Sequence, residues 1–143
     1  MTAKQISVFL QNQPGKLADF CEILSKHHID MRAMSMAESR DFGILRLIVD
    51  DSQKTADVLK EEGYVYAVTP VLAVEVPDEP GGLMKILNIL KENQINLEYS
   101  YAFIARKTDC AYMIFRVQQT EQAAEALAEG GVKLICQHEL SEL

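Results

Sequence analysis

The residues best suited to bind a ligand lie in one short phrase that the chain contains twice. The two copies are Asn12, Gln13, Pro14, Gly15, Lys16 and Leu17 and, 66 positions further on, Asp78, Glu79, Pro80, Gly81, Gly82 and Leu83. A proline at the start of a helix presets φ, and the glycine after it lets a ligand approach the backbone. The N–H groups at positions 15–17 and 81–83 are then expected to point outward at the positive end of the helix dipole. Such a helix start suits a carboxylate.

Asn12 and Asp78 lie two positions before each proline and can accept a hydrogen bond from an ammonium group. One loop would then hold both charged ends of an α-amino acid. The alternative is that Asn12 and Asp78 only cap their helices and that the Pro-Gly pair only forms a turn. The phrase alone leaves both interpretations open.

The elements around each phrase repeat as well. Before the phrase, alternating apolar residues predict a half-buried strand, and after it helical spacing predicts a helix over residues 15–28 in the first copy. Further helices are expected over 52–62, beginning at Ser52, and over 120–129, beginning at Thr120, with glycine exits at Gly63 and at Gly130-Gly131. The remaining strands are expected over 31–37, 43–50, 64–68, 97–104, 111–118 and 132–137, with a middle loop two residues longer in the second copy.

The resulting order is βαββαβ in each half, which is the ferredoxin-like pattern. The predicted fold class is therefore α+β, with two ferredoxin-like modules in tandem and antiparallel sheets that carry both helices on one face. Domain 1 is assigned to residues 1–69 and domain 2 to residues 70–143, with Thr69-Pro70 at the join. A module of about 70 residues is near the lower limit for an independent core, so the two are expected to need each other.

The composition narrows the class of protein. The chain has 143 residues, 48% of them hydrophobic and 24% charged, which is typical of a globular protein. A net charge of −7 without a cluster of basic residues argues against a nucleic-acid partner. Three scattered cysteines suggest neither a disulfide framework nor a metal site, and no cofactor motif is found. With no signal segment and no membrane-spanning stretch, we expect a cytoplasmic protein without a membrane partner.

The phrases and the segments that follow them resemble the signature of a known family. Each phrase is followed by a second short segment, His28-Ile29-Asp30-Met31 or Gln94-Ile95-Asn96-Leu97. Together they are similar to the signature of the ACT domain, a ferredoxin-like regulatory module that senses amino acids in aspartokinases, phosphoglycerate dehydrogenase and the small subunit of acetolactate synthase. The resemblance covers both halves.

The resemblance implies where a ligand would bind. Two modules of this family commonly lie side by side, with ligands between the Pro-Gly loop of one module and the second strand of the other. One site would combine residues 12–17 with Asn96 and Leu97, and the other residues 78–83 with Asp30 and Met31. Asn96 matches the asparagine often found there, whereas Asp30 introduces a carboxylate that could repel the ligand. The implied function is to bind a free amino acid effector and to regulate a separate enzyme subunit.

Two other functions are weighed against this one. Catalysis is disfavoured because acylphosphatases of this topology need an arginine in the first loop, which is absent here, and no catalytic residue is assigned. A module that only dimerises or docks on an enzyme remains open. The apolar residues Ile44, Ile48, Tyr112 and Ile114, on the sheet faces away from the helices, would form its homodimer or partner surface, or else pack under a loop of their own chain.

Overall fold

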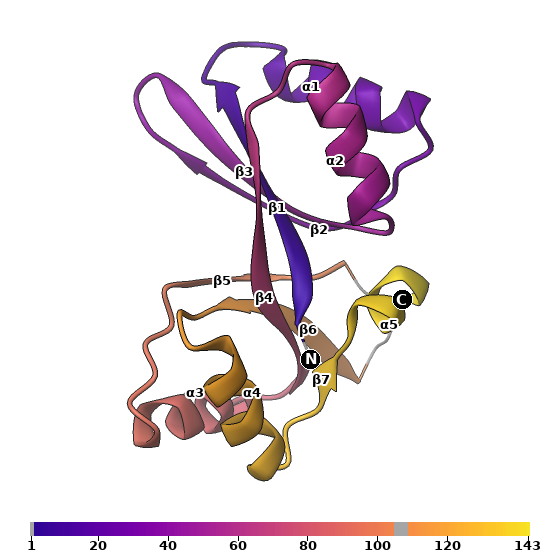
Figure 1. Ribbon diagram of the computed structural model, residues 1–143. Coiled ribbons are helices and arrows are strands. Elements are labelled where there is room, and N and C mark those ends of the chain that lie inside the picture. The colour runs from indigo at the N-terminus through magenta and orange to yellow at the C-terminus, as the bar shows by residue number, and fades with distance from the viewer. Residues whose placement is uncertain (1, 105–108) are drawn as a thin grey trace. The chain divides into compact units, whose positions relative to one another are not determined.

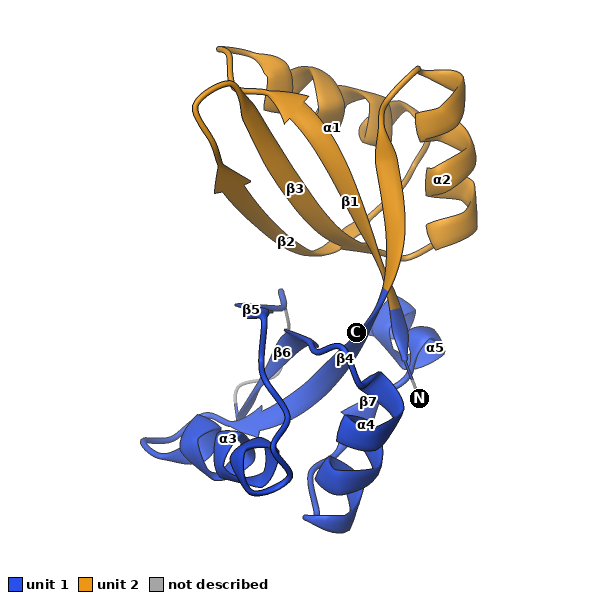
Figure 2. Cartoon of the chain, turned by 60° about the vertical axis from the view of Figure 1, so that its left-hand side comes forward, with its two compact units in different colours: residues 1–3, 70–143 blue, residues 4–69 orange. Residues whose placement is uncertain are grey.

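The computed structural model describes residues 2–104 and 109–143 of the chain. Residues 105–108, in the loop predicted to be longer in the second copy, lie outside this part. The chain divides into two compact units (Figure 2). Unit 2 comprises Lys4–Thr69, and unit 1 comprises Pro70–Leu143 with the first three residues. The assignment of two domains at residues 1–69 and 70–143, and the expectation that neither folds well alone, stay predictions.

Unit 2 is a small sheet with two helices on one face (Figure 1). Its elements are β1 (Ala3–Gln11), α1 (Lys16–Lys26), β2 (Met31–Glu38), β3 (Phe42–Val49), α2 (Ser52–Glu61) and the start of β4 (Tyr66–Pro77). The strand order is β2-β3-β1-β4. The β1–β3 and β2–β3 pairs are antiparallel, with Val8 opposite Leu45 and Met34 opposite Leu47. This is the βαββαβ arrangement predicted from the sequence.

The core of unit 2 lies between the helices and the sheet because the alternating residues of β1 and β3 face α1 and α2. Leu45, Leu47 and Val49 are fully buried in this core, as their spacing predicts. Phe20 and Leu24 of α1 and the apolar face of α2 complete it. The register of β3 is thus fixed, since a shift of one residue would turn these side chains to the other face.

Unit 1 repeats the arrangement. Its elements are the rest of β4, α3 (Gly82–Glu92), β5 (Tyr99–Ala102), β6 (Cys110–Arg116), α4 (Thr120–Glu129), β7 (Leu134–Ile135) and α5 (Gln137–Glu142). The strand order is β7-β4-β6-β5, with Val74 opposite Met113 and Tyr101 opposite Ile114. Both units are therefore ferredoxin-like, which confirms the predicted fold class.

Two boundaries and two helix caps differ from those predicted. Pro70 does not separate two strands, because the single strand β4 runs continuously from Tyr66 to Pro77. The last strand, expected over 132–137, has only two residues and is followed by the unpredicted helix α5. The helices α2 and α4 begin at Ser52 and Thr120 as expected, but their caps lie one position earlier, at Asp51 and Gln119. The Asp51 carboxylate accepts the N–H of Lys54 at 3.0 Å.

The sheet faces away from the helices are not the free surface considered above. Ile48, Tyr112 and Ile114 are each fully buried, and only Ile44 is partly exposed. In unit 1 the Tyr112 ring contacts Phe103 edge to face at 6.2 Å between centroids. Of the two alternatives left open above, packing within the chain therefore holds for these three side chains, and of the four residues only Ile44 is available to a partner.

Candidate functional site

Each Pro-Gly phrase forms a type II β-turn that ends where the helix begins. Gly15 has φ 82° and ψ −10°, and Gly81 has φ 85° and ψ −6°, which are the values of the third residue of such a turn. Pro14 and Pro80 occupy the second position, which their ring geometry favours. The proline therefore lies before the helix and not in its first turn, and the glycine is required by its positive φ.

The turn decides which backbone donors remain for a ligand. The N–H of Lys16 donates to the Gln13 carbonyl at 3.4 Å, and that of Gly82 donates to the Glu79 carbonyl at 3.1 Å. The prediction that these two groups are free is wrong. Within the described residues, the N–H groups of Gly15, Leu17 and Ala18 have no backbone acceptor, and the same holds for Gly81, Leu83 and Met84. Three donors per turn thus remain at the positive end of an 11-residue helix.

Asn12 and Asp78 do not cap the helices, since neither helix start has a side-chain cap. Asn12 instead donates through Nδ2 to the Ser39 carbonyl at 3.2 Å, and its backbone N–H donates to the Asp41 carbonyl at 3.0 Å. These bonds tie the Pro-Gly turn to the turn between β2 and β3. Because the amide nitrogen is used, the amide oxygen of Asn12 is the atom left to accept from an ammonium group.

The segments before the second strands also share one geometry. His28 and Gln94 adopt positive φ values of 53° and 56°, and Ile29 and Ile95 donate back to Leu24 and Leu90 at 3.0 and 2.9 Å. This is the hydrogen bonding of a Schellman helix end, here without the usual glycine. It positions the exposed residues Asp30 and Asn96 directly after the helix end in both units.

The carboxylate of Asp30 is not isolated. Its Oδ2 atom lies 2.9 Å from Nη1 of Arg32, and its backbone N–H donates to Asp50 at 3.1 Å. This ion pair reduces the repulsion expected between Asp30 and a ligand carboxylate. Met31 and Leu97, the other predicted residues, pack against the cores of their own units.

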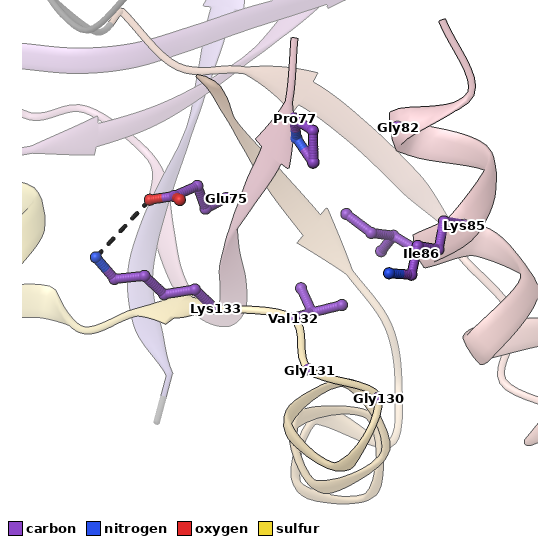
Figure 3. Close-up of a pocket in the computed structure, with 9 residues that line it drawn as sticks. All are labelled: Glu75, Pro77, Gly82, Lys85, Ile86, Gly130, Gly131, Val132 and Lys133. Carbon is purple, nitrogen blue, oxygen red and sulfur yellow. Dashed lines mark ion pairs between the residues drawn. The ribbon is translucent and has the colours of Figure 1, made fainter. Parts of the chain in front are cut away.

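A pocket of about 150 Å³ adjoins the start of α3 in unit 1 (Figure 3). It lies between the end of β4, the first turns of α3 and the turn after α4. Its lining residues are Glu75, Pro77, Gly82, Lys85, Ile86, Gly130, Gly131, Val132 and Lys133. Glu75 accepts the Tyr112 hydroxyl at 3.2 Å and lies 3.8 Å from the Lys133 ammonium.

Unit 2 contains a pocket of about 180 Å³ at the corresponding place. It is lined by Phe9, Leu10, Gln11, Lys16, Asp19 and Tyr64. Burial and the nearby carboxylates of Asp19 and Glu62 raise the pKa of Tyr64, so its hydroxyl stays protonated at neutral pH. The pocket is thus a feature of the fold, while its lining differs between the two units.

Among the residues that line the two pockets, only Gly82 and Lys16 are ligand-binding candidates from the sequence, and the others were missed. They lie on three segments that are far apart in the chain, so no local motif joins them. The repeat itself is the signal that could have found them, because Lys85 and Asp19 occupy equivalent positions with opposite charges. The predicted pairs of turn and second strand belong to different units, and their joint site stays a prediction.

The chain thus consists of two ferredoxin-like units in tandem, each with a Pro-Gly turn at the start of its first helix. The comparison with protein families agrees, since the ACT domain pair family matches residues 1–143. The chain therefore belongs to the ACT domain pair family.

Solved structures show the same fold. Protein BT0572 from Bacteroides thetaiotaomicron is 36% identical, with a TM-score of 0.94 and coverage of 100% of this chain and 98% of that chain. The regulatory subunit of aspartate kinase from Thermus thermophilus, in its ligand-free form, is 18% identical, with a TM-score of 0.65 and coverage of 89% and 91%. Its counterpart from Thermus flavus is 15% identical, with a TM-score of 0.58 and coverage of 90% and 92%. No curated protein matches the chain.

In the part of the chain that the structure describes, no group of histidine, cysteine or acidic side chains could hold a metal ion. None of the helices in residues 2–104 and 109–143 has the length and apolar character needed to cross a membrane.

Proposed function

We propose that this chain binds a free amino acid through its Pro-Gly turns and passes the signal to a separate enzyme. The observation that carries the proposal is the repeated type II turn, which leaves the N–H groups of Gly15 and Leu17, and of Gly81 and Leu83, without backbone acceptors at a helix start. An α-carboxylate needs such donors.

The side chains beside the turns would hold the α-ammonium group. In one site, residues 12–17 act with Asn96 and Leu97, and the Asn12 amide oxygen accepts from the ammonium. In the other, residues 78–83 act with Asp30 and Met31, and Asp78 supplies a carboxylate. The ion pair of Asp30 with Arg32 makes this second site more acceptable to a zwitterion than the sequence suggests.

The regulatory role rests on the family and on its structural relatives. Two of them are regulatory subunits of aspartate kinase, and they cover about the same length as this chain. By analogy with these relatives, the ACT pair would regulate an enzyme in another subunit, as a homodimer or bound to that enzyme, and would itself have no catalytic role. The proposed location is the cytoplasm, where free amino acids and their metabolic enzymes meet.

Isothermal calorimetry across the twenty amino acids tests the proposal. Loss of a hydrogen bond to a charged group costs on the order of 1.5 to 3 kcal/mol, so Asn12→Ala or Asn96→Ala should weaken binding by roughly tenfold to a hundredfold. Asn88→Ala, an exposed asparagine elsewhere on α3, is the matched control and should leave binding unchanged.

Asn12→Asp separates ligand binding from the structural role of Asn12. Aspartate keeps an oxygen for the ammonium group but loses the Nδ2 bond to Ser39. Binding that survives in Asn12→Asp and is lost in Asn12→Ala supports direct contact with the ligand. Equal loss in both would assign Asn12 to the turn alone.

The alternative function is an interaction module that dimerises or docks on an enzyme without an effector. A ligand that binds only the folded state must raise the melting temperature, so a thermal-shift panel of amino acids separates the two functions. No shift with any amino acid, together with recovery of a stable partner subunit, would favour the interaction module.

A further inference from the structure

The side chain of Arg116 connects two parts of unit 1 that are far apart in the sequence. Its Nε atom lies 3.4 Å from Oε2 of Glu98, and its Nη1 atom donates to the backbone carbonyl of Pro70 at 3.1 Å. Glu98 directly precedes β5, whereas Pro70 is the first residue of unit 1 in β4, the strand that passes from one unit to the other (Figure 2). Arg116 thus bridges the segment before β5 and the strand that joins the two units.

The segment before β5 contains Asn96, one of the residues proposed to contact an effector. Asn96 is exposed between Ile95 and Leu97, which both pack into the core of unit 1. Glu98 is fixed to Arg116 through the backbone as well, since its N–H donates to the Arg116 carbonyl at 2.9 Å. Two residues of extended chain span at most about 7 Å, so an ammonium group at Asn96 would lie close enough to interact with the Glu98 carboxylate.

Neither bond of the Arg116 side chain has its optimal length. The ion pair with Glu98 is about 0.5 Å longer than a usual charge-assisted bond, and the bond to Pro70 is near the long end of the ordinary range. Nε and Nη1 point from different edges of the rigid, planar guanidinium, so a movement toward one acceptor is a movement away from the other. A shift of about 0.5 Å would therefore complete one bond at the expense of the other. The side chains are only 22% and 30% exposed, which limits the screening of their charges by solvent.

This arrangement is specific to unit 1. The repeat places Ile48 and Arg32 where unit 1 has Arg116 and Glu98. Isoleucine cannot donate a hydrogen bond, and the guanidinium of Arg32 pairs with Asp30 in its own segment at 2.9 Å. The bridge to the joining strand is thus a feature of one copy and not a consequence of the topology.

We propose that Arg116 transmits the occupancy of the effector site at Asn96 to the strand that joins the two units. This inference rests on the proposed function, since it needs an effector whose ammonium group lies at Asn96. The ammonium group attracts the Glu98 carboxylate and competes with Arg116 for it. The guanidinium then moves toward Pro70, and its hydrogen bond to the Pro70 carbonyl shortens. By linkage, whatever strengthens this bond also favours effector binding.

Amide NMR on the isotope-labelled full chain tests the coupling, with an equimolar mixture of the twenty amino acids as the probe. The reporter is the Val71 amide, because its peptide group contains the Pro70 carbonyl. The mixture should shift this signal in a saturable manner, together with the signal of Asn96. Glu98→Gln removes the charge of residue 98 without a ligand and should shift the Val71 signal in the same direction.

Arg116→Lys separates the coupling from the charge. Lysine keeps a positive charge beside Glu98 but lacks the separate edges of the guanidinium. The Val71 responses to the mixture and to Glu98→Gln should both be lost in this background, while the Asn96 response to the mixture remains. Lys91→Met, in the exposed last turn of α3, is the matched control. It removes a positive charge close to the same segment and should leave both responses unchanged.

The signals of Asn96 and Val71 distinguish failure of this inference from failure of the proposed function. A mixture that shifts Asn96 but not Val71 would overturn the coupling and leave the effector site in place. If Asn96 does not respond, the proposed effector site fails, and Glu98→Gln alone decides the exchange at Arg116. The exchange is refuted by a Val71 signal that does not move in Glu98→Gln, or that moves equally in the Arg116→Lys background.

Discussion

Gly81 and Gly82 are adjacent, but the structure requires glycine at each for a different reason. At Gly81 the requirement is conformational, since φ is 85° and a Cβ atom would meet no heavy atom within 4 Å. At Gly82 it is steric, because a Cβ atom would overlap the carbonyl oxygen of Pro77. Alanine should therefore destabilise the fold at both positions. Asparagine in place of alanine should distinguish the conformational cause from the steric one.

The expected magnitudes follow from these causes. A left-handed conformation costs an ordinary residue about 1–2 kcal/mol, partly offset by the lower entropy of the unfolded chain, so Gly81→Ala should lose about 1 kcal/mol of unfolding free energy. Helix propensity alone predicts that Gly82→Ala gains about 1 kcal/mol. An overpacked contact costs about 1–3 kcal/mol, so the predicted net effect is a loss of about 1–2 kcal/mol.

Urea unfolding followed by circular dichroism measures these changes, and two variants serve as controls. Gly81→Asn should recover roughly half of the loss, because asparagine tolerates positive φ, whereas Gly82→Asn should be no better than Gly82→Ala. Lys16→Ala, at the position equivalent to Gly82, already carries a Cβ atom and should change stability by less than about 0.5 kcal/mol. A Gly82→Ala variant as stable as the native chain would refute the steric argument.

Three further predictions concern other parts of the chain. His28→Gly and Gln94→Gly should each raise the unfolding free energy by about 1 kcal/mol, because glycine removes the strain of their positive φ. Urea titrations measure this gain, and its absence would show that other contacts offset the strain. The pKa of Glu139 is lowered, first by the backbone N–H of Cys136, whose hydrogen bond it accepts at 2.9 Å. This hydrogen bond should therefore form above pH 4.5 and be lost as the pH falls further. The NMR shift of the Cys136 amide should titrate in this acidic range, and an amide shift that does not titrate there would contradict the prediction. Burial raises the pKa of Tyr112 above its ordinary value of 10.0. Above pH 10 this tyrosine ionises first in the unfolded chain, so the free energy of unfolding should fall as the pH rises. Tyr112→Phe should reduce this alkaline loss, and an unchanged dependence of the unfolding free energy on pH would contradict the prediction.

Side-chain periodicity was sufficient to predict the fold because each strand and helix has one face in its core. Leu45, Leu47 and Val49 alternate along β3, and all three are buried against the helices. The exits at Gly63 and Gly131 were also predictable, and their φ values of 77° and 80° are those that glycine permits. In these segments, local chemistry and tertiary packing favour the same structure.

The sequence did not predict α5 or the geometry of the Pro-Gly turn. The helix α5 has only 6 residues, too few for a periodic pattern, and it is positioned by the burial of Leu140 and by the bond of Glu139 to Cys136. A Pro-Gly pair is compatible both with a helix start and with a type II turn. Only the φ angle of the glycine distinguishes them, and the sequence does not contain it.

The two copies preserve backbone geometry more closely than they preserve side chains. The left-handed positions recur in register at Gly15 and Gly81 and at His28 and Gln94, with φ values that differ by only 3° within each pair. A ligand held by backbone N–H groups would therefore meet the same donors in both units. Discrimination between ligands must then come from the side chains that differ, such as Asp19 and Lys85.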